Sequence, residues 1–289
     1  MRKSIITVIT IIITLVLIHK VEAQQDPNFS LYHFNMNLLN PAYAGAEANE
    51  GFTMAYRKQW LGIPGAPKSI SATYSWNARK NLGFAINVYS NKYSITNRVN
   101  FSTDISYHIQ LAEERKLYFG LKVGGGFFNV DFTKILTPVP DPIFSENVNA
   151  FNMHLGFGLY LSDAKYFVSV STPNFIKEKI GENNTAEGTN FYLSGGYHFT
   201  LNENIVITPR AMMRLLSSYE NTFDFGASVD VYRKFTFGAN YNTSEMFTLY
   251  ALFKVIDKAS IGFSYDTVTS SVNNFDDDGS LDVILKYKF

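Results

Sequence analysis

The sequence has no cysteine, which excludes disulfide bonds and thiol chemistry. It has no excess of either charge, because 25 lysines and arginines balance 25 aspartates and glutamates, so its electrostatics give no reason to expect nucleic acid as a partner. It also lacks a helical membrane span, since the one long apolar run stands near the N-terminus and is too short. An exported chain without disulfides must be held together in another way, and a closed cylinder of hydrogen-bonded strands would do so.

The apolar run belongs to a predicted secretory signal peptide, residues 1–23. Arg2 and Lys3 precede it, it extends over residues 5–18, and the small residue Ala23 closes the segment. A run of about fourteen apolar residues is shorter than the ~20 of a spanning helix. We therefore predict that the mature chain is exported from the cytoplasm.

Aromatic residues are abundant and make up 16% of the chain. They suit pleated strands and the aromatic girdles of membrane interfaces. From Gly51 onward, apolar residues alternate with small, polar or charged ones, which is the period of a strand with two different faces. This alternation predicts about fourteen strands. They lie near residues 51–57, 68–76, 81–89, 97–109, 115–128, 150–161, 165–172, 188–199, 204–215, 222–231, 234–242, 246–255, 258–265 and 280–289.

The connections decide between a soluble sandwich and a membrane barrel, because the strands of both alternate. Every second connection is short, whereas the others are mostly longer, as at residues 129–149 and 173–187. Outer-membrane barrels sort their connections in this way, with turns in the periplasm and loops outside. The last strand ends on Phe289, as the terminal strands of such barrels do. We therefore predict an all-β, transmembrane, antiparallel up-and-down β-barrel over residues 51–289, with both termini periplasmic.

Two features interrupt the regular strand pattern. Pro209 cannot donate to a ladder, so a buried strand there is expected to need a bulge. The run Gly124-Gly125-Gly126 lies inside a strand and is expected to mark a bulge or kink rather than a phosphate-binding loop.

Charged residues within the strands fall on the inward parity and carry both signs, which predicts paired side chains in the lumen rather than a selectivity filter. They are Asp104, Lys122, Arg210, Arg214, Asp224, Asp230, Lys254, Asp282 and Lys286. A barrel of about fourteen strands is narrower than an open porin of 16 to 18 strands. We therefore predict an obstructed lumen, filled by residues 24–50 or by the loop at 129–149.

No catalytic or metal-binding pattern stands out, and no hydrolase, zinc-protease or phosphate-loop motif is present. The four histidines of the mature chain lack metal-ligand spacing: His33, His108, His154 and His198. We predict no enzyme activity, no cofactor and no resident metal.

One calcium-loop spacing remains as a hypothesis. The residues that match its opening are Asn274, Asp276, Asp278 and Gly279. Leu285 stands where such a loop needs a bidentate glutamate, so a solvated acidic loop is the favoured interpretation.

Residues 24–50, ahead of the first strand, contain Asn40-Pro41-Ala42-Tyr43-Ala44-Gly45. With this opening the chain resembles the PorP/SprF family of Bacteroidetes outer-membrane proteins, which is associated with type IX secretion and gliding motility. The resemblance continues along nearly all of the mature chain in short strings. These are Trp60, Gly65-Ala66-Pro67, Phe157-Gly158-Leu159-Tyr160, Tyr166-Phe167-Val168, Gly195-Gly196-Tyr197, Gly262-Phe263-Ser264-Tyr265-Asp266, Gly279-Ser280 and Leu285-Lys286-Tyr287-Lys288-Phe289.

The resemblance implies an outer-membrane barrel that supports export or surface anchoring of a secreted adhesin or other type IX cargo. Its further partners would be periplasmic or outer-membrane secretion machinery and membrane lipid. A transporter for a small or apolar solute is the alternative function. A lipid hydrolase is a third hypothesis, to which no residues can be assigned.

The motif itself predicts a turn, because Pro41 fixes φ and keeps Asn40 out of the helical region, while Gly45 can take a positive φ. Residues 24–50 are expected to form a periplasmic or lumen segment. Within it, residues 40–45 either belong to a plug or lead-in or form a partner-binding site.

Overall fold

The computed structural model describes residues 30–46, 50–134, 147–180, 184–185, 188–217, 220–268 and 278–289. Most of them form one closed antiparallel barrel of fourteen strands, one of which is built from two pieces. The strands are β1 (Gly51–Lys58), β2 (Lys68–Arg79), β3 (Leu82–Tyr93), β4 (Thr96–Ala112), β5 (Arg115–Val130), β6 (Val148–Ser162), β7 (Tyr166–Thr172), β10 (Phe191–Tyr197) with β11 (Phe199–Asn202), β12 (Ile205–Leu215), β13 (Thr222–Val231), β14 (Phe235–Asn242), β15 (Met246–Ile256), β16 (Ala259–Val268) and β17 (Ser280–Tyr287). A separate two-stranded ladder joins β8 (Lys179–Ile180) and β9 (Asn184–Thr185).

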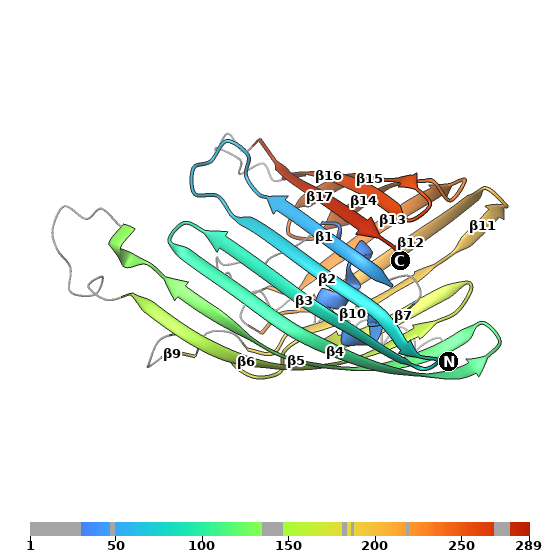
Figure 1. The fold of residues 1–289 in the computed structure, drawn as a ribbon. Helices are drawn as coiled ribbons and strands as arrows, with labels where there is room; N and C mark the ends of the chain where they lie inside the picture. The colour runs from blue at the N-terminus through green and yellow to red at the C-terminus, as the bar shows by residue number, and fades with distance from the viewer. Residues whose placement is uncertain are drawn as a thin grey trace, which may run out of the picture.

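Each barrel strand pairs with its neighbours in chain order, and β1 pairs with β17 to close the cylinder (Figure 1). The predicted all-β, antiparallel up-and-down barrel is therefore confirmed. We call one end of the barrel the turn end, because all six connections there are short. They cover residues 80–81, 113–114, 163–165, 203–204, 232–234 and 257–258. The opposite end is the loop end, and β17 finishes at the turn end beside Ala259 of β16.

Pro209 does not cause the predicted bulge. The register of β12 with β13 runs without a shift through the pair Pro209–Ala227. On the other side of β12, the ladder with Tyr197 and His198 is interrupted, and this break separates β10 from β11. A proline has no N–H to donate, so the missing bond breaks one ladder without adding a residue.

The bulge predicted at Gly124-Gly125-Gly126 is also absent, because the ladders of β5 with β4 and β6 continue through all three glycines without a shift. Their role is to leave space for neighbouring groups. A Cβ on Gly125 would lie 2.5 Å from the ring of Phe151, and one on Gly126 would lie 2.0 Å from Oδ1 of Asn100. Glycines in a strand can mark close approach as well as bulges.

The outer face of the barrel is apolar, as the alternation predicts. Large apolar side chains on it are strongly exposed, such as Leu121 on β5 at 64% and Leu201 on β11 at 63%. Aromatic rings gather at the turn end, where Tyr74 stacks on Trp76 at 5.0 Å and contacts Phe289 at 5.6 Å. Such a face is suited to lipid, with aromatic rings at the interface.

If the apolar outer face meets lipid, the cost of placing a charge on it depends on the depth of that charge in the membrane. Leu121→Arg places a charge near the middle of β5, and we expect it to lower the free energy of unfolding in lipid vesicles by about 2–4 kcal/mol. Leu201→Arg, at the turn end and equally exposed, is the matched control and should cost only about 0–1 kcal/mol. Equal costs at the two positions in urea titrations would contradict a lipid-facing outer surface.

Residues 30–46 lie inside the barrel (Figure 1, blue). They form three short 3-10 helices, η1 (Tyr32–Phe34), η2 (Met36–Leu38) and η3 (Pro41–Tyr43). We call residues 30–46 the lumen segment. Among the described residues, no helix is long and apolar enough to cross a membrane.

Candidate functional site

The lumen segment is fixed by Asn40, whose side chain is fully buried. Its Oδ1 accepts a hydrogen bond from the N–H of Ala42 at 2.8 Å and so caps η3, in which Pro41 is the first residue. Its Nδ2 donates to the carbonyl of Leu159 on β6 at 3.0 Å and to Oγ of Ser169 on β7 at 2.8 Å. One side chain therefore starts the turn and attaches it to two strands.

Two glycines on the wall let the backbone of the motif approach closely. A Cβ on Gly120 of β5 would lie 2.1 Å from the amide nitrogen of Ala42. A Cβ on Gly158 of β6 would lie 1.9 Å from Oδ1 of Asn40. Because real Cβ atoms essentially never come this close, any larger residue would push the lumen segment away from the wall.

The end of the motif meets the wall in the same manner near the turn end. Gly45 has a φ of 65°, donates its N–H to Oγ of Ser75 at 2.8 Å, and would clash with Gly83 if it carried a Cβ. The hydroxyl of Ser106 donates to the carbonyl of Ala44. The predicted turn, with glycine at a positive φ, is therefore present.

An aromatic and apolar cluster packs the lumen segment against the wall. Tyr43 stacks on Tyr160 of β6, with ring centroids 3.9 Å apart and planes at 24°. Tyr32, Met36 and Met212 are buried in the same cluster. Burial raises the pKa of Tyr43 well above its ordinary range, so this phenol stays neutral at physiological pH.

The first described residue of the lumen segment is bound to a buried ion network near the loop end. Arg57 of β1 contacts Asp282 of β17 at 2.6 Å and Asp266 of β16 at 2.5 Å, and all three side chains are at least 97% buried. Ser30 donates its N–H to Asp282 at 2.9 Å and its hydroxyl to Asp266 at 2.5 Å. The lumen segment thus runs from the loop end to the turn end and is attached at both.

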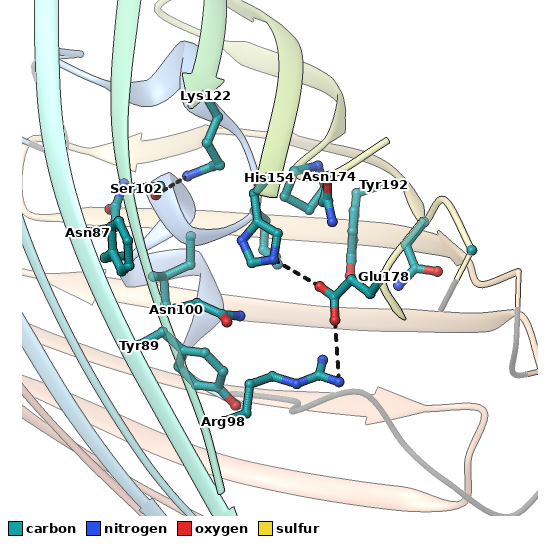
Figure 2. Close-up of a pocket in the computed structure, with 16 residues that line it drawn as sticks. Asn87, Tyr89, Arg98, Asn100, Ser102, Lys122, His154, Asn174, Glu178 and Tyr192 are labelled. Atoms are coloured by element: carbon teal, nitrogen blue, oxygen red, sulfur yellow. Dashed lines mark hydrogen bonds and ion pairs between the residues drawn. The ribbon is translucent and has the colours of Figure 1, made fainter. Parts of the chain in front are cut away.

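A cavity of about 170 Å³ lies on the loop side of the lumen segment, and we call it the loop-end cavity (Figure 2). Leu38 and Leu39 of the lumen segment form part of its lining. Glu178, in the loop after β7, contacts His154 of β6 at 3.0 Å and Arg98 of β4 at 3.5 Å. These contacts hold residues 173–180 against the wall of the barrel.

The ionised form of Glu178 is favoured in this position. Burial opposes its charge, but the hydrogen bond from His154 and the charge of Arg98 outweigh burial and lower the pKa of Glu178 below its ordinary range. Because the folded-state pKa is the lower one, this stabilisation is complete above the ordinary glutamate pKa of about 4.3. It is lost as the pH falls through the folded value.

Glu178→Gln removes the charge while keeping the shape of the side chain. We expect proteolytic cleavage within residues 173–180 to become severalfold faster at neutral pH, because the loop loses its ion pair with Arg98 and its charge-assisted hydrogen bond with His154. Acidification should accelerate cleavage of the unmodified barrel and have little effect on the variant. Lys177→Gln, at an exposed neighbouring position, is the matched control. Equal cleavage rates for Glu178→Gln and the unmodified barrel would contradict the role of these contacts.

Several of the inward-facing charged residues form the ion pairs that the sequence predicts. Lys122 contacts Asp104 at 2.8 Å and also donates to the carbonyl of Asn37, and Arg214 contacts Asp224 at 2.9 Å. Lys254, which has the same parity, is at the exposed turn end and contacts Asp257 instead.

Of the residues considered for metal binding, the structure describes the four histidines, Asp278, Gly279 and Leu285. Within the described ranges, no group of three or more histidines, aspartates or glutamates could hold a metal ion. Leu285 faces outward, while Asp278 and Gly279 precede β17. Asn274 and Asp276 lie outside the described residues.

A comparison with protein-family models matches residues 21–287 to the type IX secretion system membrane protein family PorP/SprF. The chain belongs to the PorP/SprF family. A comparison with curated proteins found no match.

Solved structures similar to this PorP/SprF protein share its fold. The toluene transporter TodX of P. putida aligns with a TM-score of 0.52 and 9% identity, over 88% of this chain and 93% of the other. A FadL homologue of Pseudomonas aeruginosa aligns with a TM-score of 0.50 and 12% identity, over 92% of this chain and 96% of the other. At such identities the likeness extends to the barrel fold alone.

Sequence reasoning missed several residues that build this site in the PorP/SprF barrel. Arg57 was not recognised as an inward charge, although Thr53, Ala55 and Arg57 share the buried parity of β1. Glu178 lies in a long connection between strands, where no alternation of apolar and polar residues indicates whether a side chain points into the lumen or away from it. The contacts of Gly120 and Gly158 join positions far apart in the chain, so no local pattern identifies them.

Proposed function

We propose that this PorP/SprF barrel supports the export or surface anchoring of a secreted adhesin or other type IX cargo, and that it does so without catalysis. Its turn end, where β17 finishes, faces the periplasm and the secretion machinery, and its loop end faces outward. The observation that supports this proposal best is the position of the lumen segment. A lumen crossed by a segment attached at both ends favours a docking or anchoring role over an open channel.

The motif at residues 40–45 acts, in this proposal, as the attachment of a plug rather than as the surface that binds cargo. Asn40, Ala42 and Ala44 have no exposed surface, so a partner would have to displace the lumen segment to reach them. At the outer end, the exposed side chains of Phe175 and Lys177 belong to the surface that cargo can reach.

Deletion of the gene tests the proposal directly. We expect a large secreted adhesin to be retained or shed instead of displayed, and complementation with the unmodified barrel should restore display. Affinity isolation of the tagged barrel from native membranes should recover the same cargo. Normal surface display in the deletion strain would contradict the proposal.

Transport of a small or apolar solute remains the second candidate, because the lumen holds cavities on either side of the lumen segment. It requires solute uptake by vesicles that contain the purified barrel, with loss on substitution of lumen residues. Uptake together with normal adhesin display in the deletion strain would favour the transporter.

A further inference from the structure

A second cavity, of about 330 Å³, lies on the turn side of the lumen segment, and we call it the turn-end cavity. The lumen segment contributes Tyr32, His33, Phe34, Met36 and Tyr43 to its lining. The wall residues that complete it stand close to the turn end of their strands, among them Phe167 of β7, Asp230 of β13 and Lys286 of β17. The cavity therefore faces the opposite end of the barrel from the loop-end cavity.

Several aromatic side chains line this cavity, among them Tyr32, Phe34, Tyr43, Tyr160 and Phe167. Tyr43 and Tyr160 stack on each other, and His33 lies 4.0 Å from Phe34 and 4.7 Å from Tyr250 between ring centroids. Rings of this kind favour a flat apolar body, which can stack on their faces or meet their edges.

Two cations and one carboxylate line the turn-end cavity: Arg210, Lys286 and Asp230. Nζ of Lys286 lies 6.0 Å from the ring centroid of Phe34. Asp230 already accepts a hydrogen bond from Thr236 at 2.5 Å. Burial, with the charges of Arg210 and Lys286, lowers the pKa of His33 well below its ordinary range. Arg210 and Lys286 therefore both lie near His33 in the lining of the cavity.

Several polar atoms at this cavity are buried without a hydrogen-bond partner among the described residues. They are Nδ1 and Nε2 of His33, Nε of Arg210 and Oγ of Ser194. Buried donors and acceptors are normally paired, and an unpaired buried group is unfavourable. An anionic group would accept a hydrogen bond from Nε of Arg210, whose Nη2 already donates to Oγ of Ser228 at 2.5 Å.

We propose that the turn-end cavity binds a small monocarboxylate with an aromatic or other apolar body. The carboxylate lies between Arg210 and Lys286, where it receives charge-assisted hydrogen bonds. The apolar body packs against the rings of Tyr43, Tyr160 and Phe167. This combination of an apolar pocket with a few convergent polar groups is the usual construction of a small-molecule site.

The test measures binding of 3-phenylpropionate to the full-length barrel in lipid nanodiscs by isothermal titration calorimetry. We expect one binding site, no detectable binding of the neutral amide 3-phenylpropionamide, and weak binding of acetate, which lacks the apolar body. Arg210→Gln and Lys286→Gln should each weaken binding about tenfold, since each removes one charged contact. Arg98→Gln, in the loop-end cavity, is the matched control and should leave the affinity unchanged.

Decanoate, as a second probe, reports whether the site accepts a chain as well as a ring, and binding of either acid that depends on Arg210 supports the proposal. Equal binding of acid and amide would overturn it, as would unchanged affinity in both glutamine variants. Absence of binding at millimolar concentration would overturn it as well. The acid-to-amide comparison uses only the unmodified barrel, so it remains decisive if a variant fails to fold.

Discussion

Replacement of Arg57 by methionine should lower the free energy of unfolding by about 3–5 kcal/mol, the cost of leaving buried charge without its partner. Arg57 is the cation between Asp266 and Asp282, and its side chain is 3% exposed. Without it, two carboxylates face each other near the loop end, with Ser30 as their remaining donor among the residues that the structure describes. Urea titration of the barrel in lipid vesicles measures the change.

A second variant separates lost charge pairing from lost packing. The triple change Arg57→Met, Asp266→Asn and Asp282→Asn removes all three charges and should recover most of the loss, because neutral groups of similar shape are far cheaper to bury. Lys254→Met breaks the exposed pair with Asp257 and should leave stability unchanged. A triple variant as unstable as Arg57→Met would show that packing, not charge, accounts for the loss.

Conductance is expected to rise sharply when the lumen segment is displaced. The double change Gly120→Val and Gly158→Val places side chains where Ala42 and Asn40 contact the wall. We expect the unmodified barrel to conduct poorly in planar bilayers and the double variant to conduct roughly tenfold more or better, since a barrel of fourteen strands lies between filled barrels and open porins.

Gly195→Val is the control for the effect of valine within a strand, because the nearest atom to a Cβ at Gly195 is the carbonyl oxygen of Phe167 at 3.2 Å. It does not contact the lumen segment in that direction and should leave conductance low. High conductance of the unmodified barrel would contradict a lumen closed by residues 30–46. Low conductance of a folded double variant would show that these glycines do not hold the segment in place.

The barrel was predictable because the features that produce it, the alternation within each strand and the lengths of the connections, are local in the sequence. Alternation of apolar and polar residues fixes which face of each strand meets lipid, and the lengths of the connections separate the two ends. Both patterns can be recognised in one sequence, and the alternation is present even in β12, where Pro209 interrupts one ladder. Glycine is different: Gly125 makes space for Phe151 on the adjacent strand, and local sequence cannot distinguish such a position from a bulge.

The candidate site was predictable only in part. Pro41 and Gly45 indicate a turn by their backbone preferences, and the turn is present. Its position in the barrel depends on Asn40 reaching β6 and β7, more than a hundred residues later in the chain. Pairing of inward charges could be expected from their signs, but the partners Arg57 and Glu178 follow from the closed three-dimensional arrangement.

The seam between β1 and β17 has a consequence for the order of assembly. Arg57 on β1 and Asp282 on β17 meet across this seam, and Ser30 binds to the same carboxylate. Both contacts need β17 in its final place, so the loop-end attachment of the lumen segment is completed only when β1 and β17 pair. Closure of the barrel and fixation of its interior segment are therefore coupled, because a barrel whose first and last strands are unpaired lacks the carboxylate position that binds Ser30.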